Sequence, residues 1–320
     1  MEIFSELASL PTRPRAVAIG AFDGVHIGHQ QVIGTAVARA RQAALTASVL
    51  TFRQHPLVII DPAHKPRTLT PLPVKIRLIS EIGPDELVLL DFDRALAELS
   101  PDAFCADVLA AALDARIVVV GENFRFGRRG GGTPAMLAVA GETLGFEAVV
   151  VPLVTEAGKT ISSTRIRALL QKGALEEVRE ILGRPPSALG TVVPGDRRGR
   201  TLGFPTANIE VTAEIIFPGR GVYAARAQID GVWYRAAVNI GHNPTFQSRD
   251  ADTTVVRVEA FLLGFSGDVY GRSIRVDFLH KIRDEQRFAG PAELVAQMQL
   301  DIAVAVELAD AEFDSVGLGN

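Results

Sequence analysis

The sequence has little cysteine, no long apolar run and no strong charge of either sign. Cys105 is the only cysteine among 320 residues, which excludes an internal disulfide and a cysteine-based zinc site. No apolar run approaches the roughly 20 residues of a membrane span, and residues 1–15 lack the apolar core of a signal peptide. We therefore expect a cytoplasmic protein that does not act at a membrane.

The net charge of the chain is small and negative. At −4, the chain lacks the basic surface that general binding to nucleic-acid phosphates requires, so we expect no nucleic-acid partner. Small phosphorylated ligands need only local positive charge and stay compatible with the sequence. Apolar residues make up 48% and charged residues 22%, as in ordinary globular proteins, and the length favours two domains.

Up to about residue 183, short apolar runs alternate with stretches of helical spacing. The strand-like runs are AVAIG at 16–20, ASVLTF at 47–52, ELVLLDF at 86–92 and RIVVVG at 116–121, and helices are expected at 30–44 and 101–113. This alternation predicts a parallel sheet covered by helices. Ligands of such sheets usually bind at the carboxyl ends of the strands.

After residue 187 the chain reads as β-rich. Strand-like runs at 223–229 and 232–238 flank a two-residue Asp-Gly turn, and further runs lie at 253–263 and 273–282. They predict a small β-barrel or sandwich, followed by a last helix after Pro291. Two prolines within residues 184–187 disfavour helix and mark a linker, so the expected domains are 1–183 and 187–320.

Two histidines, His26 and His29, follow the first strand where a helix is expected to begin. Backbone N–H groups at a helix start carry partial positive charge and often hold phosphate, and imidazole N–H groups would add donors. Glycines at 24 and 28 allow a close approach of the backbone. The sequence G-x-x-x-x-G-K-[ST] does not occur, so this is not a P-loop. A metal site, or capping and core histidines, are the alternatives.

Two further stretches carry positive charge. Residues 161–169 read ISSTRIRAL and place Arg165 and Arg167 in a first helical turn, where the helix dipole prefers acids, so a bound anion would resolve the conflict. GENFRFGRRGGG at 121–132 follows a strand and combines Asn123 with two phenylalanines and three arginines. Such a loop suits a phosphorylated or aromatic ligand. Solvated surface arginines and a plain surface turn are the alternatives.

A second group of polar residues lies beyond the linker. Residues 195–209 read GDRRGRTLGFPTANI, in which Thr206 and Asn208 offer hydroxyl and amide oxygens, hard ligands that suit Mg²⁺ better than zinc. In the strand-like run at 253–263, Arg257 and Glu259 are expected on one face. A turn entering a strand, and an exposed cross-strand ion pair, are the alternatives.

Five stretches of the chain resemble, in the same order, the motifs of the bacterial bifunctional riboflavin kinase/FMN adenylyltransferase family, also called FAD synthetase. These stretches are GAFDGVHIGH, TFRQHP, GENFRFG, ISSTRIR and TLGFPTANI. GVYAA at 221–225 and NIGHNPTF at 239–246 match as well, so the resemblance covers nearly the whole chain. It implies a Rossmann-like nucleotidylyltransferase domain followed by a β-barrel riboflavin kinase domain with a terminal helix.

For the first half, the resemblance implies transfer of AMP from ATP to FMN, giving FAD and pyrophosphate. His26 and His29 would hold the ATP phosphates and stabilise the transition state. Asn123 would help to position the nucleotide and the flavin phosphate, and Phe124 would bind the flavin. The FMN phosphate would attack the α-phosphorus directly, so catalysis would consist of positioning and charge stabilisation. The other implied ATP ligands are Gly20, Phe22, Asp23, Gly24, Ser163, Thr164 and Arg167.

For the second half, the resemblance implies phosphorylation of riboflavin to FMN. Thr206 and Asn208 would contact Mg²⁺ and ATP, and Glu259 would be the general base that takes the proton from the riboflavin 5′-hydroxyl. The expected cofactor is therefore Mg²⁺, the expected partners are ATP, riboflavin, FMN and FAD, and a homo-oligomer is left open. There are two competing hypotheses. In one, the chain is a kinase whose first half is a relic or acts on another nucleotide; in the other, it is a flavin-binding carrier or regulator.

Overall fold

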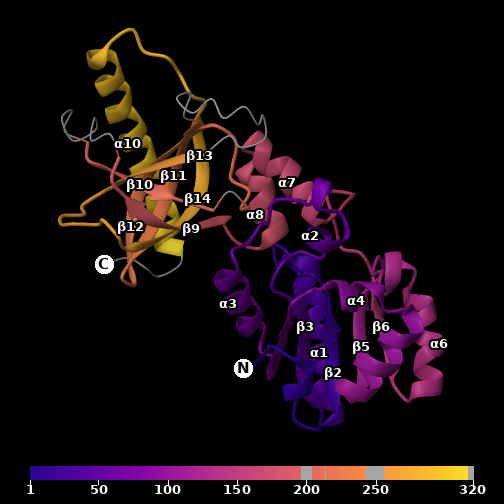
Figure 1. Ribbon diagram of the computed structural model, residues 1–320. Helices are drawn as coiled ribbons and strands as arrows, with labels where there is room; N and C mark the ends of the chain where they lie inside the picture. The colour runs from indigo at the N-terminus through magenta and orange to yellow at the C-terminus, as the bar shows by residue number, and fades with distance from the viewer. Residues whose placement is uncertain (196–203, 213, 243–255, 316–320) are drawn as a thin grey trace. The chain divides into compact units, whose positions relative to one another are not determined.

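The computed structural model describes residues 1–195, 204–212, 214–242 and 256–315. The chain divides into two compact units, one formed by residues 1–68 and 72–163 and the other by residues 69–71 and 164–320. The first unit contains an open six-stranded sheet and the second a closed barrel (Figure 1). Each unit therefore has its own architecture.

The sheet of the first unit is parallel throughout. Its strand order is β1-β4-β3-β2-β5-β6, and every neighbouring pair runs in the same direction. β2 (Arg15–Ile19) and β4 (Glu86–Leu90) are buried along their whole length, as expected for strands with helices on both faces. The remaining strands are β1 (Glu2–Phe4), β3 (Thr46–Phe52), β5 (Ala115–Gly121) and β6 (Glu147–Val151).

Helices cover both faces of this sheet. On one face α1 (Ile27–Ala43) and α3 (Leu72–Ile82) share a hydrophobic core with β2 and β3. On the other face the π-helix η3 (Phe104–Ala112) and α6 (Pro134–Leu144) pack on the strands. The short segments of the unit are η1 (Leu7–Ser9), α2 (Leu57–Ile60), η2 (Pro62–His64), α4 (Arg94–Glu98), α5 (Pro101–Ala103), η4 (Arg128–Gly130), β7 (Thr155–Glu156) and β8 (Lys159–Thr160).

The strand order creates a topological switch between β2 and β5. From β2 the chain winds through α1 to β3 and on to β4 on one side, and it later returns to β5 on the other side of β2. In open parallel sheets, ligands bind outside the carboxyl ends of the strands at such a point. Residues 20–26 follow β2 and residues 122–132 follow β5, so two of the predicted motifs flank this position.

The barrel of the second unit is antiparallel. Its strand order is β10-β13-β12-β11-β14-β9, and pairing of β9 with β10 closes it. At the turn between β11 and β12, Asp230 has φ 50° and Gly231 has φ 85°, the type I′ geometry that matches the twist of hairpin strands. The strands are β9 (Ser187–Val193), β10 (Thr206–Glu210), β11 (Gly221–Ile229), β12 (Val232–His242), β13 (Val256–Leu262) and β14 (Ser273–Arg283).

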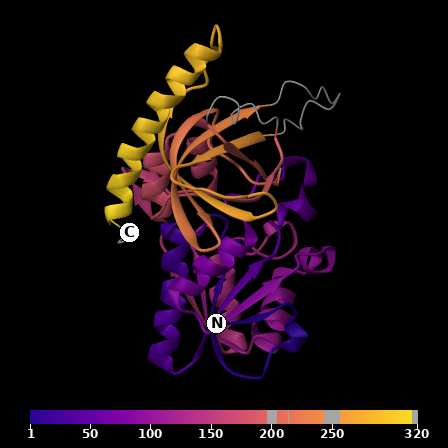
Figure 2. The ribbon, with the colours of Figure 1, turned by 90° about the vertical axis from the view of Figure 1, so that its left-hand side faces the viewer.

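A long helix, α10 (Pro291–Ser315), lies along the outside of the barrel (Figure 2). Trp233 of β12 and Leu279 of β14 pack against Ala309 of this helix. Arg283 of β14 also donates two hydrogen bonds, at 2.8 and 2.7 Å, to the buried carboxylate of Asp301. Apolar contact and a bidentate ion pair therefore fix α10 to the strands. Two further helices, α7 (Ser163–Lys172) and α8 (Leu175–Leu182), precede the barrel.

The predicted fold is confirmed in both halves. Every strand-like run overlaps an observed strand, the expected last helix begins at Pro291, and the β-rich half is a barrel rather than a sandwich. In the part of the chain that the structure describes, no helix has the length and apolar character needed to cross a membrane. Some residues of the quoted motifs lie outside the described residues: Arg197, Arg198 and Arg200 of the stretch 195–209, and the end of NIGHNPTF.

Candidate active sites

The chain leaves β2 through a bent loop, residues 20–26, before α1 begins. Phe22 and Val25 have φ of 47° and 41°, a left-handed region that residues with a Cβ rarely adopt, and Gly24 has φ 92°. His26 is the N-cap of α1, since its Nδ1 accepts the backbone N–H of His29 at 3.2 Å. The capping role considered as an alternative is therefore real. Because Nδ1 is the acceptor, the proton of a neutral His26 ring lies on Nε2.

The two predicted histidines lie against each other. The rings of His26 and His29 are stacked, with centroids 3.5 Å apart and an interplanar angle of 18°, and Phe22 meets His29 edge-on at 5.4 Å. A Cβ added to Gly28 would lie 3.3 Å from the His26 ring, so glycine leaves room for this stack. Two imidazoles thus meet a helix N-terminus at the carboxyl edge of the sheet, a setting suited to phosphate.

Side chains from outside hold the backbone of loop 20–26. The hydroxyl of Ser163, the first residue of α7, donates to the Asp23 carbonyl at 2.9 Å, which brings this serine of the ISSTRIR motif to the loop. Gln30 of α1, which the sequence did not single out, donates to the Val25 carbonyl at 2.9 Å. Thr164 and Arg167 follow in α7 and belong to the second unit, and their contacts with ATP stay predictions.

Asn123 and Phe124 lie on the loop that follows β5, the strand beside β2. Asn123 is exposed, whereas Phe124 is half-buried and stacks on Phe126 with ring centroids 5.6 Å apart. Phe126 packs in turn on Phe104 of η3 at 5.5 Å, and two backbone hydrogen bonds join Phe126 to Gly132. The base of the loop is thus anchored in the core, and Asn123 stands at the carboxyl edge.

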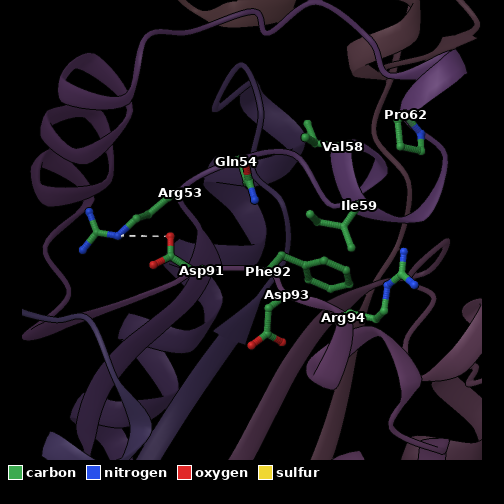
Figure 3. A pocket seen from close by; sticks show the side chains of 9 residues that line it. All are labelled: Arg53, Gln54, Val58, Ile59, Pro62, Asp91, Phe92, Asp93 and Arg94. Atoms are coloured by element: carbon green, nitrogen blue, oxygen red, sulfur yellow. Dashed lines mark ion pairs between the residues drawn. The ribbon is translucent and has the colours of Figure 1, made fainter.

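A pocket of about 460 Å³ lies at the carboxyl ends of β3 and β4 (Figure 3). Arg53 and Asp91, which follow these strands, form an ion pair of 3.5 Å within it. A pocket lined by both apolar and charged side chains suits a planar aromatic ligand that bears polar groups. Neither Asn123 nor Phe124 lines this pocket. The lining residues are Arg53, Gln54, Val58, Ile59, Pro62, Asp91, Phe92, Asp93 and Arg94.

In the second unit, the predicted kinase residues gather on two neighbouring strands. Ala207 and Ile209 of β10 are buried, so Thr206 and Asn208 lie on the other face of the strand. Asn208 is paired directly with Glu259 of β13. Arg257 donates to Asn208 Oδ1 at 3.1 Å and pairs with Glu259 at 2.9 Å. The predicted shared face of Arg257 and Glu259 is confirmed. Asn208, Arg257 and Glu259 together form what we call the barrel cluster.

Two residues beside the barrel cluster were not predicted. Asn239 of β12 pairs with Glu259 from the other side, so Asn208, Glu259 and Asn239 form one row across three strands. A Cβ added to Gly195 would lie 2.0 Å from the side-chain nitrogen of Asn208, so only glycine allows this approach of the backbone. Both residues lie within motifs that the sequence displays, but their place depends on strand pairing.

Two family models match the chain. The model described as FAD synthetase matches residues 9–165, and the model described as riboflavin kinase matches residues 182–309. The first match contains loop 20–26, Asn123 and Ser163, and the second contains the whole barrel and its cluster. Each candidate site therefore lies within one of the two matches.

Relatives are similar over almost the whole length. The bifunctional riboflavin kinase/FMN adenylyltransferase of Bacillus subtilis is 38% identical over 296 residues, covering 91% of each chain. That of Escherichia coli K12 is 36% identical over 304 residues, covering 94% of this chain and 95% of the relative. A crystal structure of a Streptococcus pneumoniae protein described as a macrolide-efflux protein matches with a TM-score of 0.84 at 33% identity, over 95% of this chain and 97% of the other. The chain therefore belongs to the bifunctional riboflavin kinase/FMN adenylyltransferase family.

Proposed function

We propose that loop 20–26, with its two histidines, is the adenylyl-transfer site and that the barrel cluster is the kinase site of a two-step enzyme. Riboflavin and ATP give FMN and ADP, and FMN and a second ATP give FAD and pyrophosphate. The observation that carries the proposal is the stacked His26–His29 pair at a helix N-terminus, in a different unit from the Asn208–Glu259 pair.

In the first unit, an oxygen of the FMN phosphate attacks the α-phosphorus of ATP. The new P–O bond forms as the bond to pyrophosphate breaks, so the enzyme forms no covalent intermediate. His26, with its proton on Nε2, and His29 donate to the phosphoryl oxygens and stabilise their charge in the transition state. The residues that bind the triphosphate and the rest of ATP are Gly20, Phe22, Asp23, Gly24, Ser163, Thr164 and Arg167.

The flavin enters this site at the carboxyl edge of the sheet. Asn123 holds the FMN phosphate and Phe124 contacts the flavin ring, while the pocket between the ends of β3 and β4 offers further apolar surface through Ile59. Phe124 and Ile59 follow different strands, so single variants separate their contributions. Phe124→Ala and Ile59→Glu should each raise the KM for FMN and leave the KM for ATP unchanged.

In the second unit, Glu259 takes the proton from the riboflavin 5′-hydroxyl, and the hydroxyl oxygen attacks the γ-phosphorus as ADP leaves. Thr206 and Asn208 contribute a hydroxyl and an amide oxygen on one face of β10, hard donors that fit Mg²⁺. When bound there, Mg²⁺ neutralises charge on the transferred phosphate. Arg257 orients both Asn208 and Glu259 through its contacts with each.

The same proposal includes the domain boundaries, the partners and the cellular location of the enzyme. The family matches at residues 9–165 and 182–309 support domains of 1–183 and 187–320, joined at the two prolines. By its contacts the structure instead groups residues 164–183 with the barrel unit. The partners are ATP and flavins rather than nucleic acid, in keeping with the negative net charge. The single cysteine, which is buried, needs no oxidising compartment and supports a cytoplasmic location.

A time course of riboflavin, FMN and FAD in one reaction with Mg²⁺ and ATP tests both halves. Formation of neither FMN nor FAD by the purified chain would contradict the proposal. The variant His29→Ala should block FAD formation while FMN still forms at the wild-type rate. Equal loss of both activities in folded H29A would show that the two sites are not independent.

A further inference from the structure

Loop 20–26 holds a conformation that its sequence does not favour. Phe22 and Val25 have φ of 47° and 41°, and Val25 is β-branched, for which positive φ is rarest. Such residues are strained and persist only where their surroundings fix the backbone. The side chains that bind the loop therefore decide whether it keeps this shape.

Side chains donate hydrogen bonds to three backbone carbonyls of the loop, at every second residue. Those of Asp23 and Val25 accept from the α7 and α1 side chains described above, and that of Ala21 accepts from Lys75 Nζ of α3 at 2.6 Å. No described peptide bond is cis, and in a trans peptide the N–H points opposite to the C=O. Holding the Ala21 carbonyl therefore sets the direction of the next N–H, that of Phe22.

Lys75 is the unusual member of this set because it is a buried cation. It is only 7% exposed, and its ammonium also donates to the carbonyl of Phe52, the last residue of β3, at 3.0 Å. Burial lowers the pKa of Lys75 to about 8, and the nearby carboxylate of Asp23 opposes that shift. A buried ammonium opposes folding, and an apolar residue would pack α3 without this penalty. An unfavourable charge beside a candidate site points to a role there.

We propose that Lys75 is a positioning residue for adenylyl transfer. Its ammonium ties loop 20–26 to the carboxyl end of β3, orients the Ala21–Phe22 peptide and sets a positive charge behind the loop that holds ATP. Thr51 of β3 supports the same carbonyl more weakly, through a hydroxyl at 3.2 Å. Lys75 acts through the loop and Asp23 rather than by touching substrate. The inference rests on the proposed ATP-binding role of loop 20–26.

Three variants of the full chain test this role. Lys75→Met removes the donors and the charge at similar length, Lys75→Arg keeps both, and Lys65→Met removes an exposed lysine as a matched control. We expect K75M to lower kcat/KM for FAD formation by about 10²-fold, the loss that misplacement of reacting groups by about 1 Å produces. Part of the loss should lie in the KM for ATP, with the KM for FMN unchanged. K75R should retain part of the activity that K75M loses. The activity of K65M should stay at the wild-type level.

Riboflavin phosphorylation in the same preparations is the internal control, because it should be unchanged in all three variants. Hydrogen exchange supplies a second readout: in K75M the amides of residues 20–26 should exchange faster, while those of β2 and β5 stay protected. Wild-type FAD formation in K75M, unchanged exchange in the loop, or an equal loss in K65M would overturn the inference. Loss of protection across β2 and β5 in K75M would also overturn it, since Lys75 would then be only structural. Absence of FAD formation in the wild-type chain would instead count against the proposed function.

Discussion

His26 and His29 are joined by two contacts at once. The backbone N–H of His29 donates to Nδ1 of His26 at 3.2 Å, and the two imidazole rings stack with centroids 3.5 Å apart. A doubly protonated His26 ring has no acceptor nitrogen, so the cap favours the neutral ring with its proton on Nε2. One hydrogen bond thus starts α1 and also sets which nitrogen of His26 can donate to a phosphate.

Two variants separate these roles of His26. Asparagine caps helices well, whereas alanine does not, so His26→Asn keeps the cap and His26→Ala loses it. Both should lose FAD formation, but only H26A should lose about 1 kcal/mol of stability in the first unit. Cys105, the only cysteine, is buried in the core of that unit, so its alkylation during denaturant unfolding reports the stability. An equal loss of stability in H26N would contradict the capping role.

The base assigned to the kinase step gives the second prediction. Glu259→Gln keeps the shape of the side chain but cannot accept the proton, so the kcat of FMN formation should fall by about 10²–10⁴-fold. Adenylylation of added FMN should be unchanged. Glu210→Gln, on the exposed end of β10, is the matched control. A normal rate of FMN formation in E259Q would remove Glu259 from this role.

The third prediction concerns the approach of Gly195 to Asn208. A Cβ at position 195 would lie 2.0 Å from the Asn208 side-chain nitrogen, so Gly195→Ala must displace that side chain from its contact with Arg257. We expect a raised KM for ATP in FMN formation, with the FAD-forming step intact. Gly290→Ala is the control, because nothing lies within 4 Å of its added Cβ. Identical kinetics in the two variants would show that the close approach has no effect on the site.

The fold and most of the site could be predicted because their signals are local. Runs such as AVAIG and RIVVVG are buried strands, and the polar stretches that follow them stand at strand ends, where a parallel sheet binds ligands. The pairing of Asn208 with Glu259 could not be read from spacing, because it depends on which strands of the barrel are neighbours. The pairing of Asn239 with Glu259 could not be predicted either, because it also depends on which strands are neighbours.

Lys75 shows a different limit of sequence analysis. It lies in the stretch LPVKIRLISEI, where a lysine reads as an ordinary exposed residue of a helix. Its burial follows from the place of α3 against loop 20–26 and the end of β3, whose carbonyls it binds. The proposed role of Lys75 depends on tertiary contacts with residues 54 and 23 positions away in the chain, which spacing within the helix does not reveal.

Lys75 also predicts how stability depends on pH. Burial lowers its pKa in the folded chain to about 8, whereas an ordinary lysine titrates near 10.5. Between these values the unfolded chain binds a proton that the folded chain has released, so this group makes the free energy of unfolding rise with pH. Below pH 8 both states are protonated, and the penalty of the buried charge is fully present.

We expect the stability of the wild-type first unit, relative to K75M, to rise between about pH 8 and 10 by at most about 1.4 kcal/mol per pH unit. Burial raises the pKa of the Cys105 thiol from 9.0 to about 11, which gives a slope of opposite sign, but this contribution is common to both proteins and cancels in the difference. Saturating pulses of Cys105 alkylation along denaturant titrations measure the first unit, and fluorescence of Trp233, the only tryptophan, follows the second as a control. Parallel stability curves for the two proteins across this range would show that Lys75 is already charged or neutral in both states and does not titrate as expected.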